Sequence, residues 1–294
     1  MGTFISNCVH DFVAGKHRIL NWNSVGVVGV RSEFQYTVVD VEFMNRTFHR
    51  NLCLNDTFGV TMAALNYNGL LLASQAEIKD EDDYEDDLNE DNEMGDEMAK
   101  RRKSSNIQFK PFNEWKDVKE WNYELKNGES VECLAVGSGW NAVLTNYNYI
   151  RIFSNNGVQK DLICQAHPIV TMAGYENFLA IVYLSGPAFN GYQPLRLKVI
   201  NMSTWDNKVL FDADCSVTPT SDLKWFGFSE EGQLFSFDTL GVVRSFSYTT
   251  QTWSPRHDFK IKHGHMFRQL WIVGISDQEL LVIEMPKDHE APSF

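Results

Sequence analysis

The chain has 294 residues, of which 43% are hydrophobic and 13% aromatic, and its formal net charge is −13. This composition supports a large apolar core and excludes a chain that is disordered throughout. The negative charge and the lack of a basic run or stripe in most of the chain argue against strong binding to duplex DNA.

Six segments share one pattern, in which a short apolar strand is followed by a turn and a second apolar strand. These segments begin at Val25, Phe58, Val131, Ile169, Leu223 and Leu270. Their spacing is near the roughly 40 to 45 residues typical of four-stranded propeller blades, once an acidic insertion is set aside. The pattern therefore predicts an all-β fold, a single six-bladed β-propeller over residues 1–294, with innermost strands that start near these positions.

The two chain ends are each about half a blade long. Residues 1–24 and 270–294 are therefore expected to share one blade, which closes the ring and removes two exposed strand edges. The small residues of VGVVGV from Val25, together with Ala63 and Ala64, are expected to line the crowded central channel. A two-sheet sandwich remains the alternative, because no WD dipeptide or kelch signature marks the blades.

A dense acidic tract interrupts the second repeat. Twelve carboxylates lie between Asp80 and Glu97, and the four bases Lys100, Arg101, Arg102 and Lys103 follow. Because such a block cannot bury enough apolar surface to offset chain ordering, residues 75–108 are predicted to be a disordered insertion. Within it, the residues from about Asp80 to Lys103 are expected to be mobile and dispensable for folding.

The stretch KRRKSS at the end of this insertion supports two hypotheses. Lys100, Arg101, Arg102 and Lys103 fit a nuclear-import patch, and Ser104 or Ser105 fits a site for a basophilic kinase. The alternative is that the four bases only neutralise the acidic run.

Residues that carry chemistry are scattered. Five cysteines (Cys8, Cys53, Cys133, Cys164 and Cys215) show no metal or redox spacing and are expected to be reduced, buried thiols. His263 and His265 alone are too few for a metal site. The carboxylate pairs Glu230–Glu231 and Asp212/Asp214 are expected to be hydrated side chains in turns between blades.

No motif for nucleotide binding or for an activated nucleophile occurs in the chain. The sequence therefore predicts no catalytic residue, no cofactor and no metal, and we expect a protein that is not an enzyme. A hydrolase that uses carboxylates in the propeller channel is the alternative. No apolar run reaches the roughly 18 residues of a membrane helix and no signal pattern opens the chain, so we expect a soluble, intracellular protein without membrane contact.

Four short motifs resemble those of a known family. They are W-N-S-V-G from Trp22, G-S-G-W from Gly137, G-V-Q-K from Gly157 and M-A-G from Met172. In this order, and over about His17 to Ile283, the chain resembles the central propeller of chromosome transmission fidelity protein 4, which in animals is called acidic nucleoplasmic DNA-binding protein.

The resemblance implies a nuclear, non-enzymatic homotrimer that serves as a scaffold of the eukaryotic replisome. Such a scaffold links the GINS part of the replicative helicase to DNA polymerase α–primase, with roles in DNA replication and sister-chromatid cohesion. In the family, a helical bundle after the propeller binds these clients. Because this sequence stops at Phe294, we expect it to lack that bundle and not to capture the client peptides. Another nuclear propeller that binds proteins is the alternative.

Overall fold

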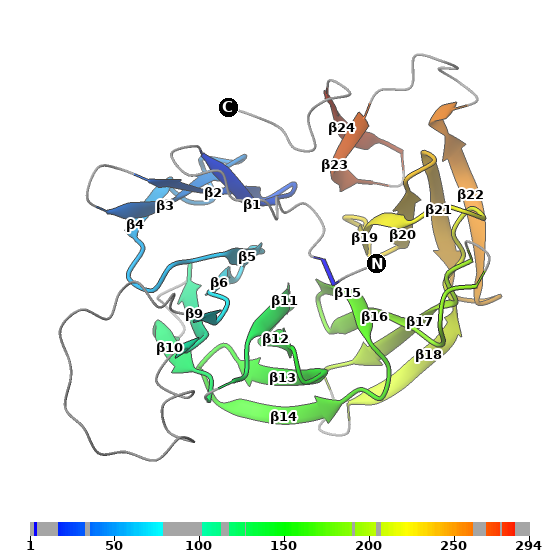
Figure 1. Ribbon diagram of the computed structural model, residues 1–294. Helices are drawn as coiled ribbons and strands as arrows, with labels where there is room; N and C mark the ends of the chain where they lie inside the picture. The colour runs from blue at the N-terminus through cyan, green and yellow to red at the C-terminus, as the bar shows by residue number, and fades with distance from the viewer. Residues whose placement is uncertain are drawn as a thin grey trace.

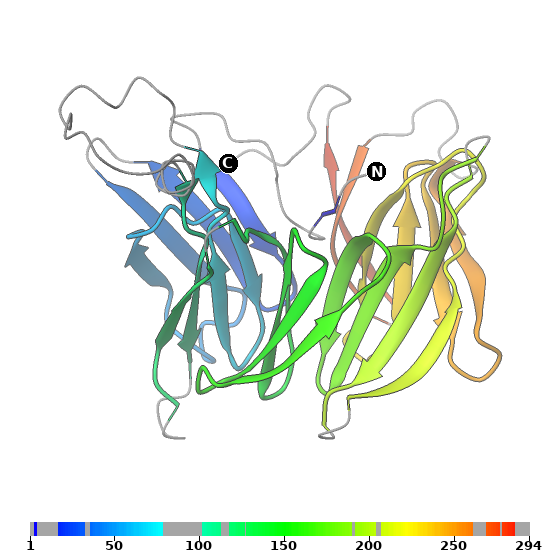
Figure 2. The same ribbon diagram turned by 60° about the horizontal axis from the view of Figure 1, so that its bottom comes forward.

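Antiparallel sheets are arranged around a central axis (Figure 1), and Figure 2 shows the same ring turned by 60°. A computed structural model describes residues 3–4, 17–32, 36–78, 102–112, 118–126, 128–189, 192–203, 207–260, 269–276 and 278–285. Five sheets have four strands each, and a sixth sheet in the ring has two. The prediction of an all-β propeller is therefore confirmed. Within the described part of the chain, no helix is long and apolar enough to cross a membrane.

The sheets are numbered here in chain order. Sheet 1 contains β1 (Arg18–Trp22), β2 (Gly26–Ser32), β3 (Thr37–Phe43) and β4 (Leu52–Asn55). Sheet 2 contains β5 (Met62–Leu65), β6 (Gly69–Ala73), β9 (Asn106–Pro111) and β10 (Trp121–Glu124). Sheet 3 contains β11 (Val131–Val136), β12 (Trp140–Thr145), β13 (Tyr149–Ser154) and β14 (Gln159–Cys164).

The remaining sheets complete the ring. Sheet 4 contains β15 (Ile169–Tyr175), β16 (Phe178–Leu184), β17 (Leu195–Asn201) and β18 (Lys208–Asp214). Sheet 5 contains β19 (Leu223–Phe228), β20 (Leu234–Asp238), β21 (Val242–Ser247) and β22 (Thr252–Asp258), and sheet 6 contains β23 (Gln269–Ile275) and β24 (Leu280–Met285). The first strand of each sheet is nearest the axis, and neighbouring first strands contact one another from β1 to β19.

Burial follows the position of a strand within its sheet. The second strands β6, β12 and β20 are buried along their whole length, because neighbouring sheets cover both of their faces. Most of their residues are therefore apolar, and in β6, GLLLA, all of them are. The outermost strands β4 and β10 alternate between half-buried and exposed residues, since only one face packs on the core.

The prediction of six complete blades is wrong for the described residues. Six hairpins of first and second strands are present, as the repeated pattern indicated, but only five of them continue into a third and a fourth strand. The second strand of sheet 6, β24, pairs with β23 and has no third strand beside it among the described residues. Most of β24 is therefore half-buried or exposed, and Leu281 is 51% exposed. The repeat count identified the hairpins and overestimated the number of complete blades.

The predicted closure of the ring by a blade shared between the chain ends stays a prediction, because residues 5–16 and 286–294 lie outside the described residues. Residues 18–22, which that prediction assigned to the shared blade, form β1, the innermost strand of sheet 1. Val25 lies in the turn after β1, and GVVGVR belongs to the second strand β2. Closer to the N-terminus, the backbone N–H of Phe4 donates to the carbonyl oxygen of Val170 in sheet 4.

Sheet 6 packs between sheets 5 and 1. Leu270 and Ile272 of β23 share a buried cluster with Trp225 of sheet 5. On the other side, Trp271 belongs to a cluster against which Trp22 of sheet 1 packs. Apolar contacts therefore connect the last sheet to the first.

The insertion lies between the second and third strands of sheet 2. Its two ends pair with each other in a short ladder of β7 (Glu77–Ile78) and β8 (Arg102–Lys103). The predicted boundaries of a disordered 75–108 are therefore too wide, because β9 begins at Asn106 and Ile107 is fully buried. The acidic tract itself, within 79–101, lies outside the described residues.

Candidate interaction site at the channel mouth

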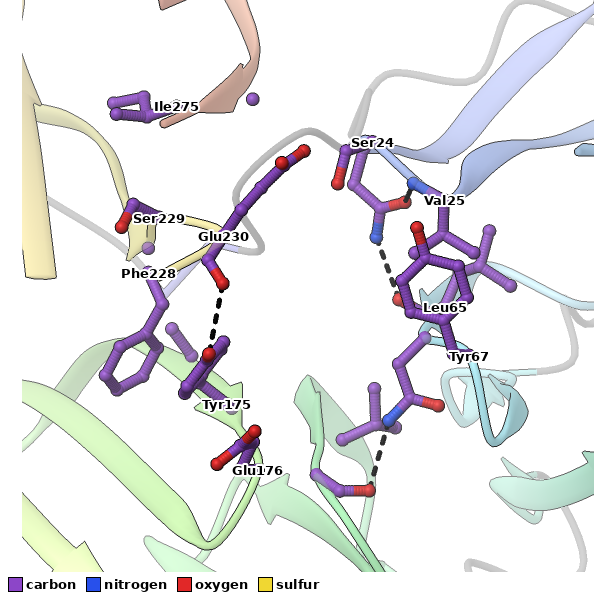
Figure 3. A pocket seen from close by; sticks show the side chains of 18 of the residues that line it. Ser24, Val25, Leu65, Tyr67, Tyr175, Glu176, Phe228, Ser229, Glu230 and Ile275 are labelled. Atoms are coloured by element: carbon purple, nitrogen blue, oxygen red, sulfur yellow. Dashed lines mark hydrogen bonds between the residues drawn. The ribbon is translucent and has the colours of Figure 1, made fainter. Parts of the chain in front are cut away.

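One end of the central channel opens into a cavity of about 580 Å³ (Figure 3). Every sheet contributes the end of its first strand, the turn that follows it, or both to the wall. The lining residues lie at 23–25, 65–68, 136–138, 173–176, 225–230 and 273–275. The same end of all six sheets therefore converges on one site.

Two asparagines connect the first three sheets in the same way. The side chain of Asn23 accepts hydrogen bonds from Val25 and Gly26 N–H through Oδ1, and its Nδ2 donates to the carbonyl oxygen of Leu65 at 2.8 Å. Asn66 repeats this arrangement in the next turn, where Nδ2 donates to the carbonyl oxygen of Gly137 at 3.1 Å. Each asparagine thus shapes its own turn and holds the turn of the following sheet.

Other groups continue this belt of hydrogen bonds around the channel. The carbonyl oxygen of Glu176 accepts from Ser138 N–H at 2.6 Å and from Trp140 Nε1 at 2.8 Å. The Tyr175 hydroxyl donates to the carbonyl oxygen of Glu230 at 3.0 Å, and the N–H of Glu230 donates to Ile275. Together these bonds connect the sheets in chain order from sheet 1 to sheet 6 and fix the backbone of the mouth.

Glycines permit the close approach of sheets 3 and 4. A Cβ on Gly174 would lie 2.2 Å from the carbonyl oxygen of Val136 and 2.9 Å from the Trp140 ring. A Cβ on Gly137 would overlap the same indole at 2.1 Å. The motifs G-S-G-W and M-A-G therefore form one packing unit around the buried Trp140.

The mouth carries negative charge. Glu176 and Glu230 are exposed, and no lysine, arginine or histidine is among the lining residues. Neither carboxylate takes part in an ion pair or a side-chain hydrogen bond within the part of the chain that the structure describes. Burial of the Tyr175 phenol raises its pKa, and the nearby charges of Glu176 and Glu231 raise it further.

An aromatic surface borders the mouth on the side of sheets 1 and 2. We call Phe43, Phe48, His49, Tyr67 and Phe112 the aromatic shelf. Their rings form a continuous cluster, with centroids 5.0 Å apart for Phe43 and Phe112 and 5.1 Å apart for Phe48 and Tyr67. Phe112 N–H donates to the carbonyl oxygen of Asn68 in the mouth. Tyr67 belongs to both surfaces, so the shelf and the mouth are continuous.

The arrangement suits binding better than catalysis. The lining hydroxyls are those of serines and tyrosines, and none of these has a lysine or histidine beside it among the lining residues. Elsewhere in the described chain, no group of three or more histidine, cysteine, aspartate or glutamate side chains is placed to hold a metal ion. The hydrolase alternative therefore gains no support from the geometry of this mouth.

The residues of the basic stretch are partly described. Lys100 and Arg101 lie outside the described residues, and Arg102 and Lys103 form β8. Ser105 is fully buried, and its hydroxyl donates to the carbonyl oxygen of Ser74 and accepts from Val131 N–H. Ser104 is half-buried and is the more accessible of the two candidate serines.

The expectation of buried thiols is confirmed for Cys133 and Cys215 and wrong for Cys53 and Cys164. The exposed pair lies on the outermost strands β4 and β14, where one face meets solvent. No disulfide joins these four described cysteines, and burial raises the pKa of Cys215 to about 12. Cys8, His263 and His265 lie outside the described residues.

The expectation for the paired carboxylates is also wrong in part. Asp212 and Asp214 are not in a turn between blades but on β18, where Arg196 of the neighbouring strand forms ion pairs with both at 2.9 and 3.1 Å. Glu230 lies in the turn within sheet 5 and lines the channel mouth. The sequence reasoning missed the mouth because Glu176 and Glu230 are in different repeats. The sequence did contain one signal of the mouth, the N-x-x-G pattern, in which Asn23 and Asn66 each stand three residues before a glycine.

Comparison with known proteins places the chain in a family. The family model described as "Minichromosome loss protein, Mcl1, middle region" matches residues 5–294. The chain belongs to this family. The match confirms the resemblance that the four sequence motifs indicated.

Relatives in this family come from animals, plants and yeast. WD repeat and HMG-box DNA-binding protein 1 of Mus musculus is 32% identical over 266 residues, which cover 89% of this chain and 21% of that protein. Protein ENHANCER OF LHP1 1 of Arabidopsis thaliana is 28% identical over 272 residues, which cover 92% of this chain and 26% of that protein. Minichromosome loss protein 1 of Schizosaccharomyces pombe is 22% identical over 289 residues, which cover 95% of this chain and 32% of that protein. The chain thus spans about a fifth to a third of the length of these relatives.

A solved propeller has a similar fold. A Kluyveromyces lactis Hsv2 with loop 6CD replaced by a Gly-Ser linker superposes with a TM-score of 0.53, over 93% of this chain and 77% of that one. The two sequences are 11% identical. This similarity supports the fold alone.

Proposed function

We propose that the chain is the propeller of a non-enzymatic nuclear scaffold that acts in DNA replication and chromosome maintenance. The observation that carries this proposal is the family match over residues 5–294, on a chain folded as a propeller. The names of the relatives, one a minichromosome loss protein and one a DNA-binding protein, support it. The channel mouth supports it as well, because its carboxylates and aromatic rings suit contact with another protein.

The scaffold has the form of a homotrimer. Cyclic symmetry uses two complementary patches on each subunit and closes without leaving an unpaired surface. Three copies bring several clients together, which matches the role of linking the GINS part of the helicase to DNA polymerase α–primase and of supporting sister-chromatid cohesion. In this proposal the propeller supplies the assembly, and the clients bind a helical bundle elsewhere in the protein.

Light scattering coupled to size-exclusion chromatography tests the assembly. At micromolar concentration, the 33.8 kDa chain should elute with three times its own mass. A stable monomer over this range contradicts the scaffold proposal.

Co-precipitation of the full-length protein from synchronised cells tests the client role. GINS and DNA polymerase α should be recovered together in S phase, and a protein that lacks the propeller should recover each in a separate complex. Joint recovery without the propeller contradicts the proposed assembly function.

A further inference from the structure

We propose that the channel mouth binds an extended segment of a partner protein that carries a lysine or arginine next to an apolar residue. The basic side chain lies between Glu176 and Glu230, and the apolar side chain packs on the aromatic shelf. The inference goes beyond the scaffold function and does not depend on the number of subunits. The carboxylates, the shelf and the rigid belt each support it independently.

The carboxylates of the mouth are available for a partner. Other acidic side chains near arginines are already neutralised: Glu129 pairs with Arg151 at 2.7 Å, and Asp238 pairs with Arg244 at 2.6 Å. Glu176 and Glu230 are exposed and have no such partner among the described residues. They therefore contribute negative charge to a concave, partly apolar site, where an incoming cation is attracted more strongly than on an open surface.

The backbone that carries these carboxylates is held in place. The carbonyl oxygen of Glu176 accepts two hydrogen bonds from sheet 3, and Glu230 is bonded on one side to Tyr175 and on the other to Ile275. A ligand therefore meets a mouth whose backbone is already ordered, and the entropy lost on binding is small. Figure 3 draws Tyr175, Glu176 and Glu230 on one side of the opening, and Ser24, Val25 and Tyr67 on the other.

The shelf supplies the apolar part of the site. Phe48 is 37% exposed and Tyr67 is 56% exposed, and the neighbouring Met44 is 53% exposed. Met44 N–H donates to the carbonyl oxygen of Val25, which lines the mouth. Exposed aromatic and methionine side chains that adjoin a cavity are typical of surfaces that bind proteins.

Charge selects a peptide over a nucleic acid. Phosphates would be repelled by Glu176 and Glu230, whereas a lysine or arginine gains ion pairs and contact with the face of Tyr67 or Tyr175. The turn that carries Phe48 also carries Arg46 and Arg50, which would repel a lysine or arginine of the partner. The basic residue of the bound segment therefore belongs at the channel end. The apolar residue then lies over the shelf.

Panning of a random heptapeptide phage library on the immobilised chain tests the proposal. The recovered sequences should be enriched in lysine or arginine next to phenylalanine, leucine, tryptophan or methionine. A synthetic fluorescein-labelled copy of the most enriched peptide then serves as the probe in anisotropy titrations. Enrichment of acidic or uncharged sequences, or no enrichment, overturns the proposal.

Matched variants locate the bound peptide. The double variant E176Q/E230Q should weaken binding of the probe roughly tenfold, the effect of removing two partly exposed ion pairs. E124Q, which changes an exposed carboxylate on β10, should leave the affinity unchanged. Because the Glu176 and Glu230 side chains make no described hydrogen bond, the melting temperature of E176Q/E230Q should match that of the unmodified chain.

The shelf is tested separately. Y67A should also weaken binding, whereas Y147A, which removes a tyrosine of similar exposure in the turn after β12, should not. Equal affinity of E176Q/E230Q and the unmodified chain, or equal effects of Y67A and Y147A, overturns the proposal. If the chain forms a trimer but fails this peptide-binding test, the scaffold function still stands. Failure of the peptide-binding proposal and failure of the scaffold proposal are therefore distinguishable.

Discussion

The side-chain amide of Asn66 donates a hydrogen bond to the carbonyl oxygen of Gly137, and so links the turn of sheet 2 to the turn of sheet 3. The same side chain accepts hydrogen bonds from Asn68 and Gly69 N–H in its own turn, at 2.8 and 3.1 Å. One residue therefore sets the shape of a turn and its distance from the next sheet.

N66A should lower the free energy of unfolding by about 2–3 kcal/mol, because three hydrogen bonds are lost and each contributes about 0.5–1.5 kcal/mol. Urea denaturation followed by tryptophan fluorescence measures the change. N122A, in an exposed position on β10, is the control and should change stability by less than about 0.5 kcal/mol. Equal losses in the two variants would show that the link between the turns is not a source of stability.

Asp238 predicts a dependence of stability on pH. Its carboxylate is fully buried and accepts hydrogen bonds from Thr218 and from Arg244. Burial alone would raise the pKa of Asp238, but these hydrogen bonds outweigh it, and the pKa is lowered. The lowered pKa means that this stabilisation is complete above the unfolded-state value of about 3.9, and is lost as the pH falls through the folded-state pKa.

D238N should destabilise the chain at pH 7 by about 3–5 kcal/mol, because the buried charge of Arg244 loses its partner. The difference between the variant and the unmodified chain should shrink as the pH is lowered below about 4. Urea titrations at pH 7 and in this acidic range measure both effects. D214N, in which the altered side chain is 86% exposed, is the control. A difference for D238N that stays constant with pH would contradict the assignment.

G174A tests the close packing of sheets 3 and 4. The added methyl group would lie 2.2 Å from a backbone oxygen, which has little freedom to move, so we expect a loss of about 1–3 kcal/mol. G29A is the matched control, because a Cβ there meets its nearest atom, the carbonyl oxygen of Arg18, at 3.5 Å. Thermal unfolding of both variants measures the contrast, and similar melting temperatures would refute the packing argument.

Ser104 and Ser105 should differ as kinase substrates. Because the Ser105 hydroxyl is buried and bonded to Ser74 and Val131, a basophilic kinase should modify Ser104 alone in the folded chain. In a synthetic peptide of residues 98–110, both serines should be modified. Mass spectrometry after treatment with protein kinase A distinguishes the two positions, and modification of Ser105 in the folded chain would contradict the observed burial.

The sequence predicted the inner hairpins well where the strand pattern is strong. The starts expected at Val131, Ile169 and Leu223 are the first residues of β11, β15 and β19. These strands are mostly apolar, with β-branched residues in β11 and β15 and aromatic residues in β19, and turn residues follow. The periodicity of the chain therefore determines this part of the fold locally.

The order of the strands in sheet 1 was not predictable in the same way. The strand β1 has the sequence RILNW, whose Arg18 and Asn21 resemble an outer strand, and the small residues of β2 resemble an inner one. Which of the two is nearest the axis depends on how whole sheets pack, and no local pattern records that. The channel mouth was missed for the same reason, since its carboxylates come together only when the sheets surround the axis.

The short ladder of β7 and β8 separates the insertion from the ring. Glu77 is opposite Lys103 and Ile78 is opposite Arg102, so the chain leaves sheet 2 and returns to it at a single point. Residues added or removed between these two strands should not alter the spacing of β6 and β9. This position can therefore diverge rapidly in evolution, and a fluorescent protein or an affinity tag inserted there should leave the propeller assembled.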